Sequence, residues 1–460
     1  MHQVRGWMAV ALACAAVAVL GACSTYSRQA PAIRDAMARD DYETAIKEVE
    51  KIDRSGSELL YCYELGLVLH EQGDYAGSNA VFERADQVLE ELYTRSISRE
   101  IGAVIVNEGL VKYRGDAFEA VLVNYYKILN YLFLGETGDA LVECRRLNQK
   151  LQWIHDAGET YFADDPFLQY LTGLVYERGD EPGSAEVSYR AALQAYGADS
   201  TLAAPPWLPC DAARNARLQG DAALAATYAK DASCETANGM RGRVAVMIET
   251  GIVARKQETS FTVPILNNDR YRNQDDYCHQ LYARRGVQYQ NTKLVKYWLH
   301  VALPVLQADP PVGHRAVVRA SRISEKATER DGQGAEVTAV QVENLDGQAA
   351  RAFKEKEATI VMRAIARALA KYLASETANN KNEGLGTLVN LLGVVTETAD
   401  TRSWTTLPAS IELARLDLEP GKYRIDVDVV DPRGLLLVHR SFDDVTVRPN
   451  GLEVRRVRLR

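Results

Sequence analysis

The chain has 460 residues, of which 47% are hydrophobic and 25% are charged, and its formal net charge is −8. This length and apolar content are sufficient for two domains with hydrophobic cores. A net acidic chain lacks the basic character typical of nucleic-acid-binding proteins, so we expect no nucleic-acid partner.

The first predicted element is a lipoprotein signal peptide over residues 1–22. The uncharged run Trp7–Leu20 follows Arg5 and is shorter than the about 20 apolar residues that span a bilayer, as is typical of a secretory signal. It ends in the letters LGAC, which resemble the bacterial lipobox, in which the cysteine thiol receives a diacylglycerol and cleavage precedes the cysteine. We therefore expect lipidation of Cys23; an ordinary cleaved signal with an incidental cysteine is the alternative.

The expected lipid anchor predicts where the protein resides. Two or more acyl chains hold a protein stably on a membrane. Ser24 follows the cysteine in place of the aspartate that favours inner-membrane retention in many Gram-negative lipoproteins, so the resemblance implies the outer membrane, with the protein facing the periplasm. Residues 23–31 are expected to form a lipidated linker.

The chain contains seven cysteines. Cys62 and Cys144 lie among apolar neighbours in helical patterns and are expected in the core. Cys210 and Cys234 flank a short predicted helical hairpin and are the pair best placed for a disulfide in an oxidising compartment. Spacing alone does not determine the distance between their Cα atoms, so the sequence does not decide whether this disulfide forms.

Residues 32–238 are predicted to form a helical domain that resembles tetratricopeptide repeats. In residues 64–85, ELGLVLHEQGDYAGSNAVFERA, the small Gly66 allows two helices to approach and Phe82 fills the groove between them. Gly173 and Tyr189 occupy the corresponding positions of a second match. Because other helices intervene, we expect an irregular solenoid with a concave groove for a peptide or partner helix; a generic helical domain is the alternative.

Residues 242–460 are predicted to form an antiparallel β-sandwich-like domain with a helical insertion at about 347–400, which makes the fold class α+β. Alternating strands separated by Gly and Pro turns carry this prediction. In the last strand the apolar phase shifts, which predicts a β-bulge at Arg455–Arg456. The two halves are expected to fold separately, with a boundary near residues 235–245.

The insertion contains the stretch EATIVMRAIARALAKYLA, residues 357–374. Apolar residues at helical spacing form a stripe beside a basic row of Arg363, Arg367 and Lys371. We expect a helix packed on the rest of the protein; a helix on a membrane surface is the alternative.

The sequence contains none of the motifs that mark common enzyme classes, such as a nucleophile elbow, a P-loop or a dinucleotide fingerprint. We therefore expect no enzymatic activity, no catalytic residue, no cofactor and no metal; an enzyme of unrecognised type is the third hypothesis for the function.

A polar connector at residues 267–291 is rich in tyrosine and arginine, the side chains that dominate binding hot spots. It is a candidate partner-binding loop, and a surface loop that covers the edge of the sheet is the alternative. Its candidate residues are Tyr271, Tyr277, Tyr282, Arg284, Arg285 and Tyr289.

Together with the lipobox, two stretches of the chain resemble a family of bacterial tetratricopeptide-containing lipoproteins of unassigned function. These stretches are residues 113–148 and 397–416. Genes of that family often lie beside lipoproteins similar to the penicillin-binding-protein activator LpoB, which implies work in the cell envelope. The leading hypothesis is a non-enzymatic scaffold for envelope proteins; the alternative is a module that binds peptidoglycan or another envelope polymer through the 267–291 loop. Arg402 and Trp404 are expected to anchor a contact between the two halves; a binding site is the alternative.

Overall fold

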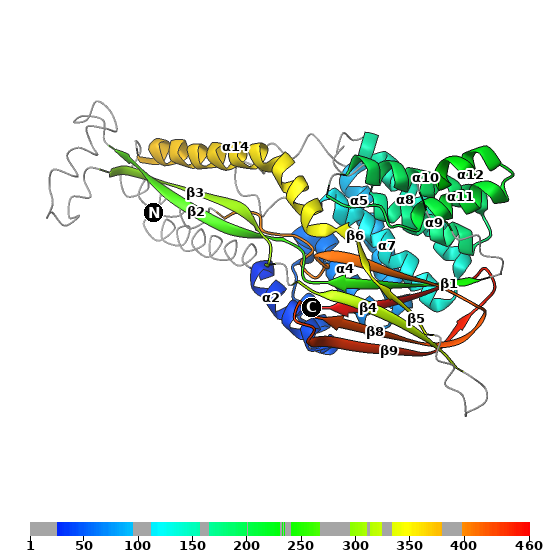
Figure 1. Cartoon of the computed structure of the whole chain (residues 1–460). Coiled ribbons are helices and arrows are strands. Elements are labelled where there is room, and N and C mark those ends of the chain that lie inside the picture. Colours follow the sequence, from blue (N-terminus) through cyan, green and yellow to red (C-terminus); the bar gives the residue numbers. More distant parts are fainter. Residues whose placement is uncertain are drawn as a thin grey trace.

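The computed structural model describes residues 25–94, 112–156, 165–199, 201–230, 232, 234, 241–266, 295–310, 313–323, 334–379 and 398–460. The predicted signal peptide and the lipidation site Cys23 lie outside these residues. The described part mixes helices and sheets, which confirms the mixed fold class (Figure 1).

The first described half of the chain consists of helices, most of them paired into antiparallel hairpins. The hairpins are α2 (Thr25–Ala38) with α3 (Tyr42–Val49), α4 (Arg54–Gln72) with α5 (Tyr75–Thr94), α7 (Ala117–Leu134) with α8 (Thr137–Asp156), α9 (Pro166–Arg178) with α10 (Pro182–Ala198), and α11 (Leu208–Leu218) with α12 (Ala222–Ala229). The α4–α5 turn contains Gly73, whose φ of 90° is a left-handed conformation that glycine adopts without steric cost.

Two of these hairpins pack as the tetratricopeptide pattern predicts. The hydroxyl of Ser78 donates a 2.7 Å hydrogen bond to the carbonyl oxygen of Gly66, and the ring of Phe82 lies directly on that glycine. In the α9–α10 hairpin the ring of Tyr189 lies on Gly173 in the same way. The absence of a side chain on the first helix is therefore what allows a large aromatic residue on the second to be fully buried.

This packing predicts a cost for adding one methyl group. A Cβ at position 66 would lie 2.7 Å from Cδ1 of Phe82, so Gly66→Ala is expected to lower the free energy of unfolding by about 1–3 kcal/mol. Gly138→Ala, in α8, is the matched control because nothing lies within 4 Å of the added atom. Urea unfolding of both variants checks the prediction, and equal stabilities would contradict it.

The strands described in the second half form three sheets. Two have four strands, in the orders β10-β1-β7-β6 and β5-β4-β8-β9, and the third pairs β2 with β3. The strands are β1 (Gly242–Thr250), β2 (Arg255–Leu266), β3 (Val295–Gln307), β4 (Arg315–Arg322), β5 (Ala335–Thr338), β6 (Val340–Asn344), β7 (Ser410–Leu418), β8 (Gly421–Val430), β9 (Leu436–Val447) and β10 (Leu452–Leu459).

The β1 sheet is the middle layer of the molecule. One face shares a hydrophobic core with the β8 sheet, through residues such as Val246 and Val427. The opposite face, with Met247 and Leu413, belongs to the core of the helical half. Both faces are covered, which explains why β1 is a continuous buried run rather than an alternating one.

Two expectations about β10 are wrong. The strand runs parallel to β1, so the sheet is not antiparallel throughout, and its register runs from Leu452 to Leu459 without a bulge at Arg455–Arg456. The apolar phase shifts because Val454 faces the helices whereas Val457 faces the second sheet. Arg456 continues the row of residues that face the helices, and its guanidinium forms ion pairs with buried carboxylates on that side.

The expected linker at residues 23–31 is also wrong, because α2 begins at Thr25. The side chain of Tyr26 is buried, and its hydroxyl oxygen lies 2.6 Å from a carboxylate oxygen of Glu64 and 2.6 Å from the carbonyl oxygen of Ser403. Only Ser24 therefore separates the expected lipidation site from a packed helix.

The two halves meet in one continuous core, which conflicts with the expectation that they fold separately. Trp404 comes from the strand half, is fully buried, and stacks on Tyr63 of α4 with 4.6 Å between the ring centroids. Its backbone N–H donates to Glu119 of α7, and Arg402 donates to the carbonyl oxygen of Gly56. The expected contact between the halves through Arg402 and Trp404 is therefore present.

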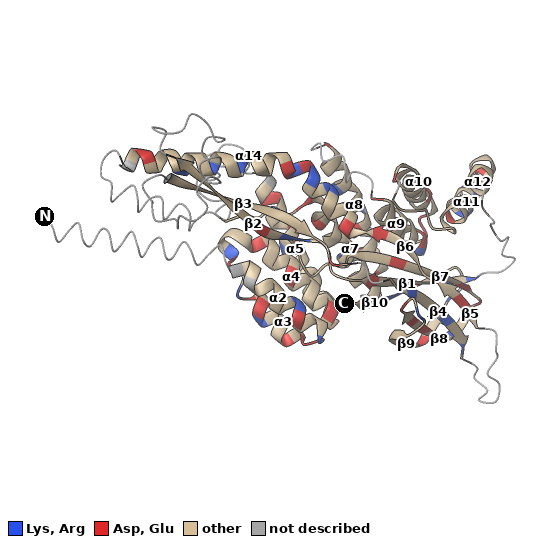
Figure 2. Cartoon of the chain, turned by 60° about the vertical axis from the view of Figure 1, so that its left-hand side comes forward, with Lys and Arg blue, Asp and Glu red and all other residues tan. Residues whose placement is uncertain are grey.

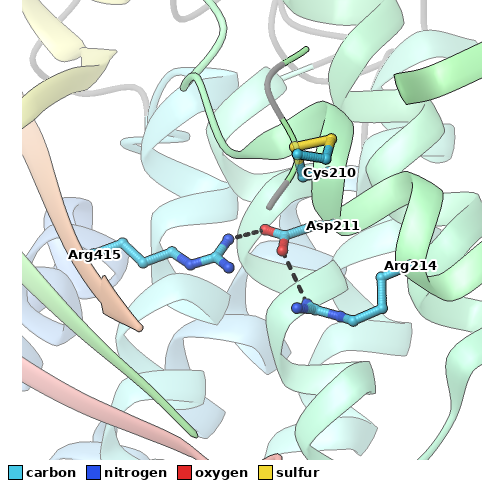
Figure 3. Close-up of a disulfide and its surroundings, with 5 residues drawn as sticks. Cys210, Asp211, Arg214 and Arg415 are labelled. Atoms are coloured by element: carbon cyan, nitrogen blue, oxygen red, sulfur yellow. Dashed lines mark hydrogen bonds and ion pairs between the residues drawn. A yellow bond between two sulfur atoms is a disulfide. The ribbon is translucent and has the colours of Figure 1, made fainter. Parts of the chain in front are cut away.

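Buried ion pairs also join the halves. Cys210 and Cys234 form a disulfide with their Cα atoms 5.4 Å apart, the pair that the sequence favours, and the next residue is the fully buried Asp211. Figure 3 shows Arg415 of β7 and Arg214 of α11 directed at this carboxylate, with N···O distances of 2.5 Å and 2.9 Å. Asp211 thus ties the helical hairpin to the middle sheet. The free cysteines Cys62 and Cys144 are buried, as expected.

The helical insertion is α14 (Leu345–Asn379), which is shorter in its described part than the expected 347–400 because residues 380–397 lie outside the described chain. Its first turns pack in the main core, and the remainder extends from the body beside β2 and β3 (Figures 1 and 2). We call β2, β3 and the part of α14 from residue 358 onward the arm.

Candidate ligand-binding site

The turns of successive helical hairpins lie along one edge of the helical half, and β10 runs beside them. Arg460 forms an ion pair with Asp40 at the α2–α3 turn, and Arg456 forms one with Glu71 near the α4–α5 turn. At the far end of the row, the Arg178 guanidinium at the end of α9 donates to the carbonyl oxygen of Leu452. The last strand therefore crosses a row of helix ends.

A pocket of about 830 Å³ lies between these helix ends, β9 and β10. Its walls combine aromatic side chains, including Tyr75 and Phe133, with many guanidinium groups. Of the described residues, three with a carboxylate line it: Asp40, Glu71 and Glu453. We call it the arginine pocket. Its arginines are Arg178, Arg440, Arg448, Arg455, Arg456, Arg458 and Arg460.

Some of these arginines hold the layers together. The guanidinium of Arg456 lies 2.5 Å from a carboxylate oxygen of Glu71 on α4 and 2.5 Å from one of Glu249 on β1, and Arg460 lies 3.0 Å from Glu71. Burial raises the pKa of Glu71, but attraction and hydrogen bonding to Arg456, with Arg460 and Arg458 nearby, outweigh burial and lower the pKa to about 2. Glu71 is consequently a buried anion that structural arginines neutralise.

A second set of arginines in this pocket has few carboxylates nearby to neutralise its positive charge. Burial lowers the pKa of the Arg178 guanidinium; Glu453 opposes this, while the positive charges of Arg448 and Arg455 lower it further. Arg455 lies 3.5 Å from Glu453, whereas within the described chain Arg448 forms no ion pair. We call Arg178, Arg448 and Arg455 the arginine cluster. An anionic group placed among them would relieve their mutual repulsion and accept planar, paired hydrogen bonds.

His70 makes the wall of this pocket sensitive to pH. It is buried, and its Nδ1 lies 2.5 Å from Oδ1 of Asn130. Burial, and then repulsion by Arg456, lower the pKa of His70 to about 4. A histidine with a depressed folded-state pKa stabilises the fold above its ordinary pKa of about 6.5. This contribution is lost as the pH falls toward 4, by about 1.4 kcal/mol for each pH unit between the two pKa values.

We therefore expect His70→Gln to be less stable than the parent protein at pH 7.5, and this difference to shrink as the pH falls to 5. Glu71 does not contribute in this window, because its stabilising effect is lost only below about pH 4.5. Urea unfolding at the two pH values measures the difference. The exposed His155→Gln is the control and should parallel the parent protein; the same behaviour in His70→Gln would contradict the prediction.

A second, smaller hollow of about 530 Å³ lies on the helical half between α5, α7 and α8. Exposed apolar side chains of Leu134 and Val142 border it, together with Glu136 and Asp139. It is a surface of the kind that could accept a helix, and its charged side chains are mostly acidic: Glu83, Glu136, Asp139 and Glu143, with Arg146.

The binding loop predicted at residues 267–291 lies outside the described residues, and so do Tyr271, Tyr277, Tyr282, Arg284, Arg285 and Tyr289. The arginine pocket was not predicted from the sequence. The signal available was the density of arginines at the end of the chain, four in the six residues 455–460, which by itself indicates only a shift in strand phase.

Within the described residues, no cluster of three or more histidine, cysteine, aspartate or glutamate side chains is arranged to hold a metal ion. None of the helices in that part of the chain combines the length and the apolar character needed to cross a membrane.

No protein-family model matches the chain, and no curated protein matches it. Among solved structures, the chain is similar to the crystal structure of MamA protein, with 14% sequence identity, coverage of 45% of this chain and 88% of that chain, and a TM-score of 0.28. A likeness at this level supports no conclusion about fold or function, so the function is inferred from the residues and contacts described above.

Proposed function

We propose that the protein is a lipoprotein, anchored by Cys23 in the outer membrane and facing the periplasm, that acts as a non-enzymatic scaffold in cell-envelope assembly. Its arginine pocket would hold an acidic segment of an envelope protein. The arginine cluster carries this proposal, because Arg178, Arg448 and Arg455 all line the pocket and, in the described part of the chain, the ion pair that they form is that of Arg455 with Glu453.

The surroundings of the cluster favour a peptide-like ligand. The pocket is open, and Tyr75 and Phe133 form a tilted pair in its wall with 5.0 Å between the ring centroids, which provides apolar area beside the charges. Arginine and aromatic side chains together are typical of interaction hot spots. The resemblance to envelope lipoproteins and the paired helices support a scaffold, and peptidoglycan or another anionic polymer is the alternative ligand.

The test uses a photo-cross-linking residue at Leu134, which is exposed and borders the arginine pocket. We expect it to capture a defined envelope protein in cells, and Arg448→Gln with Arg455→Gln to reduce the product about tenfold or more. Arg217→Gln is the matched control, because this arginine is exposed on α11, and Leu218 is the control position for the cross-linker.

Cross-linking that is unchanged in the double variant would contradict a role for the cluster. Retention of the protein on purified peptidoglycan that depends on Arg448 and Arg455, with no protein product, would favour the polymer instead. Anchoring is tested separately: Cys23→Ala should abolish acyl labelling and leave the precursor uncleaved by the lipoprotein peptidase, and labelling and cleavage at the parent level would contradict the anchor.

A further inference from the structure

The arm is a projection with an unusual surface. Its hairpin pairs Phe261 with Val301, and α14 packs on β3 through Ala364 and Ala368, so that each element covers only one side of the other. Both views show α14 and the β2–β3 ribbon side by side and extending together beyond the other described elements (Figures 1 and 2).

The free side of α14 carries large apolar side chains. Met362 is 68% exposed and Leu373 is 60% exposed, and Ile365 and Leu369 between them are exposed as well. The spacings of three, four and four residues place the four on one helical face. We call this face the apolar stripe. Phe261, Val263 and Trp298 of the hairpin are also exposed. The helix is thus packed on the rest of the protein, as expected, but the four side chains of its apolar stripe are exposed.

The charged residues of the arm are mostly basic, and its acidic residues are Glu258 of β2 and Glu376 of α14. Helix residues 358–375 and strand residues 259–266 and 297–307 contain no aspartate or glutamate. The basic residues among them are Arg363, which is exposed, the buried Arg367, and Lys371. Apolar side chains together with mostly positive charge are typical of helices that lie at the surface of a bilayer.

The beginning of the described chain lies near the base of the arm. Arg34 of α2 is close enough to Arg255, the first residue of β2, for the two positive charges to repel, which together with burial lowers the pKa of Arg34. Arg255 is held by Asp309 beyond the end of β3, with N···O distances of 2.8 Å. A lipid on Cys23, two residues before α2, would therefore hold the base of the arm close to the membrane.

We propose that the arm lies on the lipid bilayer, with the apolar stripe inserted at the headgroup boundary, an inference that takes its orientation from the proposed lipid anchor. A second copy of the chain is a poorer fit to this surface. The stripe extends over about 16 Å of helix. The area of such a short stripe is too small for a standard protein–protein interface, which buries about 800 Å² on each partner. An apolar face beside positive charge binds a membrane in proportion to the area that it buries.

The full mature chain without its lipid tests this proposal independently of the anchor. We expect it to float with vesicles of phosphatidylethanolamine and phosphatidylglycerol, and Met362→Gln with Leu373→Gln to weaken this binding about tenfold or more. Leu218→Gln, at a 66% exposed leucine on α11, is the matched control and should bind as the parent does.

Three results would overturn the proposal: no binding of the lipid-free chain to these vesicles, equal binding by the double variant, or a dimer in solution that the double variant dissociates while vesicles are not bound. Because all the substituted side chains are exposed, melting temperatures near that of the parent are expected and serve as the control for folding. Loss of acyl labelling in Cys23→Ala concerns only the anchor and leaves the result for the arm unaffected.

Discussion

Replacement of Trp404 by alanine is expected to lower the free energy of unfolding by about 3–5 kcal/mol. The side chain is fully buried, stacks on Tyr63, and lies with ring centroids 5.9 Å from Phe82 and 6.0 Å from Tyr126. Its removal leaves a cavity at the boundary between the helical and strand halves, where rings from α4, α5 and α7 cannot all move inward to fill it. The indole Nε1–H also donates to the hydroxyl of Thr406, which would lose this partner.

Because Trp404 belongs to the core shared by both halves, we expect both to unfold in one transition at lower denaturant concentration. Urea unfolding followed by circular dichroism at helix and strand wavelengths measures this. Trp153→Ala, on the surface of α8, is the control and should change stability by only about 0.5 kcal/mol. A variant whose helices melt early while its strands retain the parent midpoint would show two independent units and contradict the shared core.

Arg456→Met is expected to have an effect of similar size, about 3–5 kcal/mol, because it leaves two buried carboxylates without their main partner. Glu249 is fully buried and accepts hydrogen bonds from the hydroxyls of Tyr125 and Tyr126, at 2.9 Å and 3.4 Å. Glu71 would retain its ion pair with Arg460 at 3.0 Å. Most of the lost stability therefore comes from the Glu249 carboxylate. Urea unfolding at pH 7.5 measures the loss.

A second substitution separates the uncompensated charge from lost packing. Glu249→Gln removes the negative charge but keeps an acceptor for Tyr125. The double variant Arg456→Met with Glu249→Gln should therefore be more stable than the sum of the single losses by about 0.5–3 kcal/mol, the usual coupling between contacting groups. Additive losses would show that the ion pair contributes nothing beyond packing. Arg424→Met, which removes an exposed arginine from β8, is the surface control.

Much of the secondary structure could be predicted because it depends on neighbours in the chain. The hairpin between α4 and α5 is encoded by a small residue at Gly66, a turn at Gly73 and an aromatic residue at Phe82, all within about five helical turns. Strand β8 alternates buried and exposed residues because one face is packed and the other meets solvent. The nearby pair Cys210–Cys234 could be identified for the same reason.

The errors concern β10 and α2, whose surroundings come from distant parts of the chain. A strand covered on both faces loses the alternation that identifies register, and Arg456 could not be recognised as buried without knowing that Glu71 and Glu249 would meet it. Tyr26 looked like part of a linker because its partners, Glu64 and Ser403, are 38 and 377 residues away.

Local sequence patterns were therefore enough to predict the helical hairpins, most of the strands and the insertion helix. The three-layer arrangement, the parallel pairing of β10 with β1, the arginine pocket and the outward apolar stripe depend on contacts between residues far apart in the chain. Burial decides such features, since the same arginine is a solvated charge on a free strand and an ion-pair partner beneath a row of helix ends. No local pattern records which of these surroundings the folded chain provides.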